Sequence, residues 1–549
     1  MVVLLLWGLD SVLAQQQPCK WLIPAETTMI DGRSGFSQVK PGDTICLSSG
    51  NKLFLWISYL HGTKASPIVI CNKDGLVSIS GFYYGLKFDS CSYIKLTGFS
   101  VANPKYGIKI HDVSGAGISI EGLSTDIEVE GIEVSKTMLV GLFAKTDPDC
   151  QFTSTRGKYT LRNLSIHDNY FRQTGMEAFY IGSSFYEGQT IPCGGVDTTV
   201  LPHLLRGVKV YNNIIENTGW DGIQVSCSDS GCAIHDNFIR YDSDSAYTYQ
   251  MSGIMMGGGS TCDCFNNIIK DGKGDGIDVF SLGNQKIYNN LIINAGRTYH
   301  YNENYYPYLK HGIYIGNGVT TPNAGFSLFY NTIVSPKSTG IRFANLISKN
   351  NLISNNIIVN PGLYQSEGDN AFISITDPSI IVSISNNYFN KYIGSAEFVD
   401  STGNFDLKPI SPAINKGTAV AGFPLLFDII NRNRPFSSAN DIGAYECHDS
   451  SLLTIHEMLD STLCSVILTP NPFYNSLKII LTTREKMAVN IQMVGANGQD
   501  ALKPINLSLE SGRVEYLIDT STLGPGFYTC KILTPKKLII RKLIHVKVI

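Results

Sequence analysis

Short runs of alternating apolar and polar residues recur along most of the chain. In SGIMM at 252, DGIDV at 275 and HGIYI at 311, a glycine is followed by apolar residues at every second position. Alternation with a period of two is typical of a half-buried β-strand whose Ile and Val side chains face the core. The pattern therefore predicts many short strands and argues against a long helical bundle.

An asparagine-containing segment lies between these strands. Segments such as VYNNIIE (Val210–Glu216) and IYNNLII (Ile287–Ile293) recur at intervals that are often 23 or 24 residues. This period matches one coil of a parallel β-helix, in which each coil stacks on the next and none is stable alone. An inward-facing Asn can bond to its counterpart one coil along, so we interpret this column as structural and assign it no chemistry. The column comprises Asn169, Asn213, Asn237, Asn267, Asn290, Asn356 and Asn387, with Thr332 in the sixth copy.

The composition also favours strands and turns. The chain has 549 residues with 52 Gly, and only 16% of its residues are charged, against about 25% in a typical soluble protein. Its net charge of −3 gives no indication of a nucleic-acid partner. Residues 1–14, MVVLLLWGLDSVLA, are largely apolar and end in Val12-Leu13-Ala14, which predicts a signal peptide and secretion.

Both ends of the repeat carry characteristic segments. VKPGDTICLSSG (Val39–Gly50) lies at its start, and SPAINKG (Ser411–Gly417) and NDIGAYE (Asn440–Glu446) lie at its end. Together with the coil repeat, these segments resemble the right-handed parallel β-helix superfamily, which holds pectate lyases, polygalacturonases, alginate and chondroitin lyases and phage tailspikes. The resemblance implies an all-β fold, with a right-handed parallel β-helix over residues 15–447, and a protein that acts on polysaccharide.

The segment after this repeat has a different pattern. We place a linker at residues 448–464 and a small Ig-like β-sandwich at residues 465–549, where short alternating runs are separated by Pro and Gly turns. LTPNPF (Leu468–Phe473), VGANGQ (Val494–Gln499) and LGPGFY (Leu523–Tyr528) resemble the C-terminal sorting domain of type IX secretion substrates of Bacteroidetes-type bacteria. The resemblance implies the type IX secretion machinery as a partner and a final location on the cell surface or in the medium.

Residues at the same place in successive coils form columns, with a spacing of about 4.8 Å per coil. We expect two columns to face outward, because the alternating Ile and Val face inward. The position before the Gly is held by Val140, Glu177, Asp221, Ser252, Asp275, His311 and Thr339. The second position after the Gly is held by Phe143, Tyr180, Gln224, Met255, Asp278, Tyr314 and Arg342. Together these columns predict a charged stripe along one outer face.

Carboxylates of the first column suit glycoside hydrolysis, which is the favoured reaction. Glu177 and Asp221 occupy neighbouring coils, so their expected separation of about 5 Å matches a retaining glycosidase. Asp221 and Asp275 lie two coils apart, at about 9.6 Å, which suits an inverting pair. Crowding would raise the pKa of one carboxyl and leave it protonated near neutral pH. The structural alternative is that Asp before Gly is simply a favoured turn residue.

The segments GDGIDVF, HGIYIGN and TGIRFAN resemble, in their order, the catalytic region of polygalacturonases. The resemblance implies that Asp275 and Asp278 act as acid or base, that His311 supports them and that Arg342 binds a uronate carboxylate. The chain departs from that pattern because it lacks an Asp-Asp coil and has Lys310 where a Gly precedes the His.

Lys145 offers a different reaction, because it closes the strand one coil before Glu177. Lyases of this fold use Lys or Arg to abstract the C5 proton of a uronate, while Ca²⁺ or Arg neutralises the carboxylate. A calcium-assisted polysaccharide lyase is therefore the second interpretation; a solvated Lys145 is the structural one. The acidic residues that could offer oxygen ligands to Ca²⁺ are Asp147, Asp149, Asp242 and Asp244.

Aromatic residues accumulate in inserted loops beside the predicted stripe, at Arg297–His311 and Ile239–Gln250. Aromatic rings stack on sugar faces, so these loops favour sugar contact over simple packing. The expected substrate-binding residues are Tyr180, Trp220, Gln224, Tyr305, Tyr306, Tyr314 and Arg342. A monomeric, non-catalytic glycan-binding protein or adhesin is the third interpretation.

The 13 cysteines are an odd number, and secretion favours disulfides among them. Cys227 and Cys232, and Cys262 and Cys264, lie near enough to pair locally or across strands. A zinc site built from the same four is the weaker alternative, because no His accompanies them at the spacing of a zinc finger.

Overall fold

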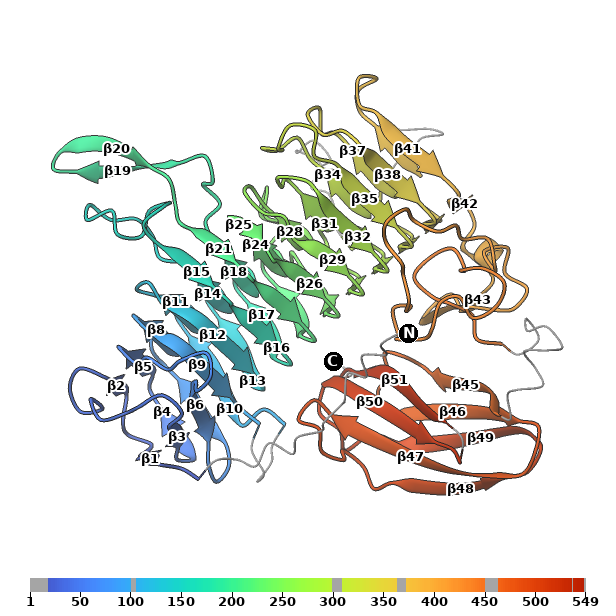
Figure 1. Cartoon of the computed structure of the whole chain (residues 1–549), viewed down its shortest axis with the longest axis horizontal. Coiled ribbons are helices and arrows are strands. Elements are labelled where there is room, and N and C mark those ends of the chain that lie inside the picture. The colour runs from blue at the N-terminus through green and yellow to red at the C-terminus, as the bar shows by residue number, and fades with distance from the viewer. Residues whose placement is uncertain are drawn as a thin grey trace, which may run out of the picture.

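The computed structural model describes residues 18–99, 105–298, 309–362, 372–449, 463–535 and 537–547. Three parallel sheets of 13, 12 and 12 strands run side by side, and each coil of the chain adds one strand to each sheet in turn. The chain therefore forms the parallel β-helix that the repeat predicts (Figure 1). The predicted signal peptide lies outside the described residues, as does most of the predicted linker. Among the helices of the described ranges, none is long and apolar enough to cross a membrane.

The strands are short, mostly three to six residues in the β-helix. The first sheet contains β1 (Trp21–Ile23), β3 (Thr44–Leu47), β6 (Ile68–Asn72), β9 (Ser92–Thr97), β12 (Thr125–Glu130), β16 (Ser165–His167), β22 (Lys209–Tyr211), β26 (Ala233–His235), β29 (Asp263–Phe265), β32 (Gln285–Tyr288), β35 (Phe326–Phe329), β38 (Asn351–Ser354) and β41 (Val382–Ser385). The second contains β4 (Gly50–Lys52), β7 (Val77–Ser80), β10 (Ile108–Val113), β13 (Ile132–Thr137), β17 (Tyr170–Thr174), β23 (Ile214–Thr218), β27 (Phe238–Arg240), β30 (Ile268–Lys270), β33 (Leu291–Ile293), β36 (Thr332–Val334), β39 (Ile357–Val359) and β42 (Tyr388–Asn390). The third contains β2 (Met29–Asp31), β5 (Leu55–Ser58), β8 (Leu86–Asp89), β11 (Ile118–Glu121), β14 (Leu142–Ala144), β18 (Phe179–Ile181), β24 (Ile223–Val225), β28 (Ser252–Met256), β31 (Asp275–Val279), β34 (Ile313–Ile315), β37 (Ile341–Phe343) and β40 (Ile373–Ile375).

The interior of the coil stack is apolar, as the alternation predicts. In β14, Leu142 and Ala144 are fully buried while Phe143 between them is only half-buried. The buried side chains of neighbouring coils join into one continuous core that extends from Ile23 to Ile380. Burial of this kind is the main driving force for stacking the coils.

A ladder of buried asparagines joins eight coils at the turn between the first and second sheets. The amide nitrogen of Asn213 donates to Oδ1 of Asn237 at 3.0 Å, and the backbone N–H of Asn213 donates to the same oxygen at 3.1 Å. Asn237 repeats both bonds to Asn267, and Asn267 repeats them to Asn290. Because each side chain satisfies a backbone group of the preceding coil, the ladder holds these eight coils in one register.

One member of the predicted column is wrong. In the sixth copy the ladder passes through Asn331, which links Asn290 to Asn356, and not through Thr332. The residue before each ladder Asn adopts the left-handed conformation, and here that residue is Tyr330 with φ 56°. The other copies have Asn or Asp at this position, and both adopt the left-handed conformation more readily than Tyr. The Tyr in this copy therefore hid the shift by one residue.

Aromatic rings stack on the outer side of the first sheet, next to this turn. Neighbouring ring centroids lie 4.5 to 5.2 Å apart, and the rings are nearly parallel. The stack contains His167, Tyr211, His235, Phe265, Tyr288 and Phe329. Because each ring covers the face of the next, the stack stabilises the coils and leaves no ring face open for a ligand.

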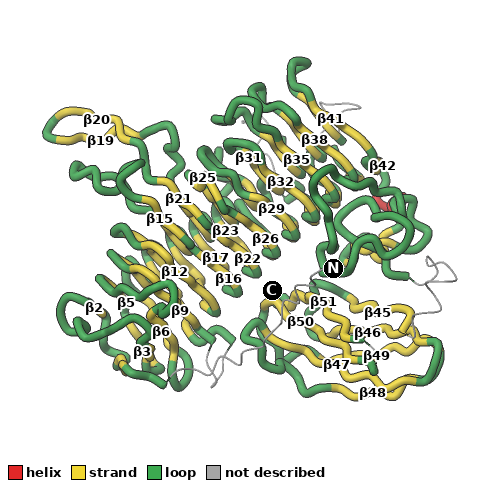
Figure 2. The backbone as a smooth tube through the Cα atoms, in the orientation of Figure 1, coloured by secondary structure: helices red, strands yellow, loops and turns green. Residues whose placement is uncertain are grey.

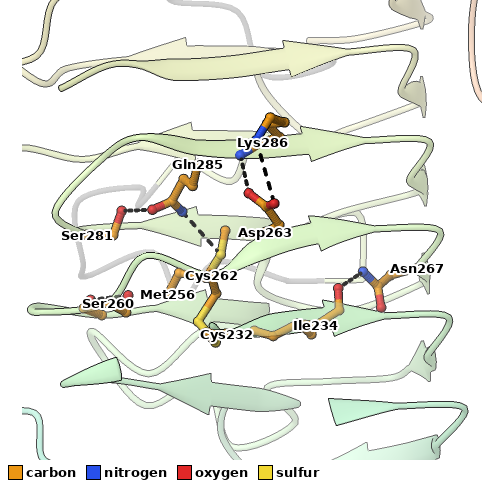
Figure 3. The surroundings of a disulfide bond; sticks show 11 residues. Cys232, Ile234, Met256, Ser260, Cys262, Asp263, Asn267, Ser281, Gln285 and Lys286 are labelled. Carbon is orange, nitrogen blue, oxygen red and sulfur yellow. Dashed lines mark hydrogen bonds and ion pairs between the residues drawn. A yellow bond between two sulfur atoms is a disulfide. The ribbon is translucent and has the colours of Figure 1, made fainter. Parts of the chain in front are cut away.

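Within the part of the chain that the structure describes, three disulfides connect neighbouring segments: Cys19–Cys46, Cys150–Cys193 and Cys232–Cys262. The last one joins two successive coils, as Figure 3 shows, so two of the four neighbouring cysteines pair across strands and not locally. Cys227 and Cys264 are reduced and buried. The zinc interpretation fails because two of its four ligands are consumed by a disulfide.

The C-terminal part forms two antiparallel sheets that share a core of their own (Figure 2). This arrangement is a β-sandwich, as predicted. One sheet contains β45 (Leu463–Thr469), β46 (Ser476–Thr483) and β49 (Gly512–Asp519), and the other contains β48 (Ile505–Leu509), β47 (Met487–Gly495), β50 (Gly526–Leu533) and β51 (Leu538–His545).

The sandwich packs against the second sheet of the β-helix. Lys105 and Tyr106 both donate to the backbone carbonyl of Pro525, at 2.9 and 2.8 Å. Burial lowers the pKa of Lys105 to about 7. On the other side of the contact, Lys542 forms an ion pair with Asp236 at 3.0 Å. The sandwich is thus joined to the β-helix by polar contacts as well as by a shared apolar cluster.

The asparagine ladder should contribute strongly to stability. Substitution Asn267→Ala leaves Asn237 without its acceptor and the carbonyl of Ile234 without its donor. We expect the free energy of unfolding to fall by about 3 kcal/mol, because each unsatisfied buried group costs roughly 1–3 kcal/mol. Denaturant titration measures the loss. The exposed Asn51→Ala in β4 is the control, and an equal effect of both variants would contradict the structural role of the ladder.

Candidate functional site

The third sheet aligns both predicted columns in the expected register. Ser252 pairs with Asp275, and Gln224, Met255 and Asp278 follow one another across β24, β28 and β31. The glycines between the columns are required by the close stacking. A Cβ on Gly222 would lie 2.5 Å from the carbonyl oxygen of Gly253 one coil along. Glycine therefore fixes where the chain turns into the strand and so where the preceding acid lies.

The columns are not the exposed stripe that the alternation predicts. Glu177 is 2% exposed, Asp221 0% and Asp275 3%. The inserted loop after β27 (Phe238–Arg240) accounts for part of this burial, because its residue Gln250 lies against Glu177 and Asp221. The strand pattern does indicate which side chains leave the core, but it cannot indicate that an insertion folds back over them.

Glu177 and Asp221 share one hydrogen-bond donor. With its nitrogen facing the surrounding oxygens, the amide of Gln250 donates to Asp221 Oδ2 at 2.9 Å, to Glu177 Oε1 at 3.2 Å and to Gln224 Oε1 at 3.0 Å. Asp221 Oδ1 accepts from the backbone N–H and the hydroxyl of Ser252, at 2.7 and 2.8 Å. Glu177 Oε2 is buried without a hydrogen-bond partner among the described residues. Asp221 is therefore held on both oxygens, while Glu177 keeps one oxygen unengaged.

Burial makes both carboxyls weaker acids. It raises the pKa of Glu177 to about 7, although the nearby Lys145 opposes the shift. Burial and the charge of Glu177 raise the pKa of Asp221 well above its usual value, against the hydrogen bonds from Ser252. Two close carboxyls in a medium of low dielectric ionise one after the other, so the pair retains a proton near neutral pH.

A second cluster lies two coils beyond Asp221, on β31. Asp275 forms an ion pair with Lys310 at 2.7 Å and accepts the backbone N–H of His311 at 2.5 Å. Asp278 Oδ1 is buried without a hydrogen-bond partner among the described residues. Burial and the neighbouring Asp275 raise the pKa of Asp278 well above its usual value. Burial alone would lower the pKa of Lys310, but Asp275 and Asp278 outweigh it and raise that pKa.

Asp242, from the same loop as Gln250, adds a fifth buried carboxyl. Its Oδ1 accepts from the hydroxyl of Ser243 at 2.8 Å and the N–H of Gly274 at 3.3 Å. Burial raises its pKa to about 6. The third sheet thus collects five buried carboxyl groups, with Lys310 as the buried cation that pairs with one of them.

The residues expected to bind substrate surround the Glu177 pair to different degrees. Trp220 stacks on Tyr247 of the covering loop, with ring centroids 4.5 Å apart and an angle of 12°. Tyr180 is half-buried and shares a hydrogen bond with Ser184 at 3.0 Å, whereas Gln224 is buried and donates to the same hydroxyl at 2.7 Å. Trp220, Tyr180 and Gln224 therefore lie next to the carboxyl pair.

The other expected binding residues lie further along the sheet or cannot be placed. Tyr314 and Arg342 are half-buried neighbours on β34 and β37, beyond the second cluster. The ring of His311 lies 5.8 Å from that of Tyr314. Tyr305 and Tyr306 lie outside the described residues.

Lys145 lies beside the pair but is engaged elsewhere. Its ammonium forms an ion pair with Asp147 at 2.7 Å and lies 5.1 Å from the centre of the Tyr180 ring. The ammonium is thus occupied by a carboxylate and an aromatic ring, whereas a lyase base must be free to reach the C5 proton of its substrate. Its position fits the sequence pattern, but its contacts disfavour that role.

The four candidate calcium ligands engage separate partners. Asp147 pairs with Lys145, Asp149 accepts the N–H of Gln151 at 3.0 Å, and Asp244 faces Lys273 at 3.5 Å. Within the described ranges, three ligand-type residues come close enough to hold a metal ion only at Glu128, Glu130 and His167.

That group is an ion-pair network. Lys95 lies 2.7 Å from Glu128 and 2.8 Å from Glu130. The hydrogen bond to His167 is the largest contribution that lowers the pKa of Glu128, to about 2. Burial alone would lower the pKa of His167, but Asp168 and Glu128 outweigh it and raise that pKa to about 9. A protonated His is no metal ligand, so Lys95 and His167 supply the positive charge themselves.

A cavity of about 800 Å³ lies elsewhere, between the β-helix and the C-terminal sandwich. Charged residues in its lining neutralise one another. Glu133 pairs with Lys109 at 2.9 Å and with Arg172 at 3.1 Å. The volume of this cavity alone therefore does not make it a functional site, and the five buried carboxyls of the third sheet remain the better candidate.

The pattern of alternating residues did not predict the contacts of Gln250 or the ion pair of Lys310 with Asp275. Lys310 stood out only as a departure from the polygalacturonase order. Both residues do share one sequence signal: each lies at the end of an inserted loop, Gln250 two residues before β28 and Lys310 three residues before β34.

Comparison with known proteins identifies the C-terminal part. Residues 468–547 match the family described as the secretion system C-terminal sorting domain. This domain marks proteins that the type IX system exports to the cell surface or the medium. A search of curated proteins finds no significant match to the chain.

Solved structures resemble the β-helix at low identity. One is the Agl-KA catalytic domain, with 14% identity and a TM-score of 0.35; the match covers 64% of this chain and 60% of that one. Another is the enzymatically active domain of bacteriophage CBA120 tailspike protein 2, with 11% identity and a TM-score of 0.21, over 92% of this chain and 71% of that one. Neither likeness identifies a reaction for this chain.

The buried proton of Glu177 should make stability depend on pH. Its pKa is about 7 in the folded protein and 4.5 without the shift. The folded state therefore binds more protons between these values, and this stabilisation is lost as the pH rises through 7. Glu177→Gln removes the effect, so the stability of the variant relative to the wild type should rise by about 3 kcal/mol between pH 5 and 8.

Denaturant titrations of both proteins at the two pH values measure this difference. The exposed Glu187→Gln is the matched control and should leave the pH dependence unchanged. A relative stability of Glu177→Gln that does not change with pH would contradict a protonated Glu177.

Proposed function

We propose that the protein is an exported glycoside hydrolase, in which Glu177 acts as the general acid and Asp221 as its carboxylate partner. The observation that carries the proposal is the pair itself: two buried carboxyls in the same register position of neighbouring coils, with raised pKa values and one shared donor. Structural acids in turns normally lie at the surface or have their oxygens satisfied. This pair is buried, and Glu177 Oε2 is unsatisfied.

Glu177 suits the acid role for two reasons. Its pKa of about 7 keeps a large fraction protonated at neutral pH, where a catalytic acid works best. Its oxygen without a partner is available to give a proton to the oxygen of the leaving sugar. Protonation of that oxygen lets the glycosidic bond break without expelling an alkoxide.

Asp221 suits the role of the charged partner. Both hydrogen bonds to its Oδ1 come from Ser252, whose backbone N–H can only donate. Such bonds fix the orientation of the carboxyl and oppose the rise in its pKa that burial and the charge of Glu177 cause. A spacing of one coil, about 4.8 Å, is close to the 5–5.5 Å of retaining enzymes. We therefore assign Asp221 as the nucleophile that forms a glycosyl-enzyme intermediate, which water then hydrolyses with Glu177 as the base.

The surroundings support a carbohydrate substrate. Trp220, Tyr247 and Tyr180 border the pair, and flat aromatic rings cover the apolar faces of sugar rings. The excess of buried carboxyls would repel a uronate polymer. This balance, together with the ion pair of Lys145, favours hydrolysis over the calcium-assisted elimination.

An activity screen of the full chain tests the reaction class. It should include neutral, uronate and amino-sugar polysaccharides, with and without Ca²⁺, and should follow new reducing ends and the ultraviolet absorbance of unsaturated uronates. We expect reducing ends without absorbance and no effect of a chelator. Absorbance would overturn the proposal in favour of the lyase, and glycan binding without cleavage would leave a binding protein.

Substitution of either carboxyl should separate binding from turnover. Glu177→Gln and Asp221→Asn should each lower kcat by about a thousandfold, within the range that general acid–base catalysis supplies, while glycan affinity stays within about threefold. Asp197→Asn, in the exposed hairpin β19 (Gln189–Cys193) to β20 (Val196–Val200), is the matched control and should retain full activity. Equal loss of binding and turnover, or of neither, would rule out these assignments.

A further inference from the structure

Three acceptor oxygens converge on one nitrogen at the Glu177 pair. The Gln250 amide nitrogen lies 2.9 Å from Asp221 Oδ2, 3.2 Å from Glu177 Oε1 and 3.0 Å from Gln224 Oε1. These three oxygens define what we call the acceptor triad. A side-chain amide carries two N–H bonds, so Gln250 cannot satisfy three acceptors fully.

A primary ammonium group fits the acceptor triad better than this amide does. It has three N–H donors, one for each oxygen. Two of the three acceptors belong to carboxyl groups, and hydrogen bonds between a cation and a carboxylate are about twice as strong as those between neutral groups. Gln250 therefore resembles a neutral stand-in for a cationic nitrogen.

The charge around the acceptor triad points the same way. Glu177, Asp221, Asp242, Asp275 and Asp278 are all buried on or against the third sheet. Of the nearby cations, Lys310 pairs with one of the five, Asp275, and Lys145 pairs with Asp147, which is not among them. Independently of the triad, Glu177 Oε2 is buried at 2% exposure without a hydrogen-bond partner among the described residues. The site thus has acceptor oxygens that a positively charged hydrogen-bond donor could satisfy.

Gln250 lies in the later part of the covering loop, which has fewer backbone bonds to the β-helix than its first part. Its first part is fixed by backbone bonds, from Ser243 to Trp220 at 2.9 Å and from Ser245 to Gly219 at 3.0 Å. The later backbone bond from Gln250 goes to Tyr247 in the same loop. Tyr247 is held by its stack on Trp220 and is about half exposed. A ligand that reaches the acceptor triad must therefore displace the segment from Tyr247 to Gln250, while the part fixed to Trp220 and Gly219 can stay in place.

We propose that the acceptor triad binds the 2-ammonium group of a hexosamine, so that the substrate is a polysaccharide with free amino sugars and Gln250 occupies its site in the unliganded protein. The inference rests on the proposed function, because the pair acts at C1 and the substituent on C2 is the next group along the ring. In retaining glycosidases, bonds to the C2 substituent strengthen in the transition state. An amine at that position would use the same carboxylates.

Binding of three monosaccharides to the full chain tests this inference without any need for activity. D-Glucosamine, N-acetyl-D-glucosamine and D-glucose differ only in the group on C2. Titration calorimetry or ligand-observed NMR at pH 7 should give a Kd for glucosamine that is at least about tenfold lower than for the other two, as one charge-assisted hydrogen bond is enough to produce. Equal affinities, or no binding of glucosamine at tens of millimolar, would overturn it.

Two variants test the part played by Gln250. Gln250→Ala removes the competing amide and should strengthen glucosamine binding by about three- to tenfold, a change that loss of a merely structural contact would not produce. Glu177→Gln should weaken it by about tenfold or more. The exposed Gln38→Ala is the matched control and should have no effect. Weaker binding in Gln250→Ala would contradict the stand-in role.

The two proposals fail in different ways. If neutral polymers are cleaved with dependence on Glu177 while glucosamine shows no preference, the amine site is wrong and the hydrolase stands. If glucosamine binds selectively but no polysaccharide is cleaved, the acceptor triad stands as a binding site and the hydrolase is wrong.

Discussion

The register between coils is the constraint on which the rest of this structure depends. Eight asparagines bond side chain to side chain and side chain to backbone, from Asn169 to Asn387. Each bond is formed inside a core where an unmatched polar group would cost roughly 1–3 kcal/mol. A slip of one residue would break both bonds of every rung and turn the Ile and Val of the strands outward. The ladder therefore fixes which residues of neighbouring coils face one another.

This register explains why acids separated by long stretches of sequence meet. Glu177 and Asp221 are 44 residues apart in sequence, as are Asn169 and Asn213 of the same two coils. Glycine after each acid lets the backbone approach the next coil, and the acid at that turn then lies above its neighbour. Because a loop covers them, the acids lose solvation, and their pKa values rise. The raised pKa values at the site thus follow from the stacking of the coils and from the loop that covers the acids.

Most of the fold could be predicted from the sequence, because period-two alternation and a repeating Asn are strong local signals. The columns of the third sheet follow directly from that repeat. The error at Thr332 arose because Tyr330 takes a left-handed turn that Asn usually takes. The burial of Asp221, the contact of Gln250 and the ion pair of Lys310 could not be predicted, since they depend on how inserted loops fold back. Loop conformation leaves no periodic trace in a sequence.

The C-terminal sorting domain contacts the β-helix on a different sheet from the one that holds the carboxyl pair. Lys105 and Tyr106 donate hydrogen bonds to the carbonyl of Pro525 on the side of the second sheet, while the carboxyl pair lies on the third sheet. Export and the proposed catalysis therefore use different faces of the same coil stack. Removal of the sorting domain would expose Lys105 to solvent without touching Glu177 or Asp221.

The central claim is that the coil stack holds a protonated carboxyl at neutral pH. Infrared difference spectroscopy of the full chain tests it most directly, because a protonated carboxyl has a C=O stretch that ionised groups lack. With ¹³C-labelled glutamate, we expect an isotope-shifted carboxylic acid band at pH 6.5 that fades near pH 7. The band should be weaker in Glu177→Gln and not lost, because burial also raises the pKa of Glu446 to about 7. A spectrum that shows only ionised glutamates at pH 6.5 would contradict the account.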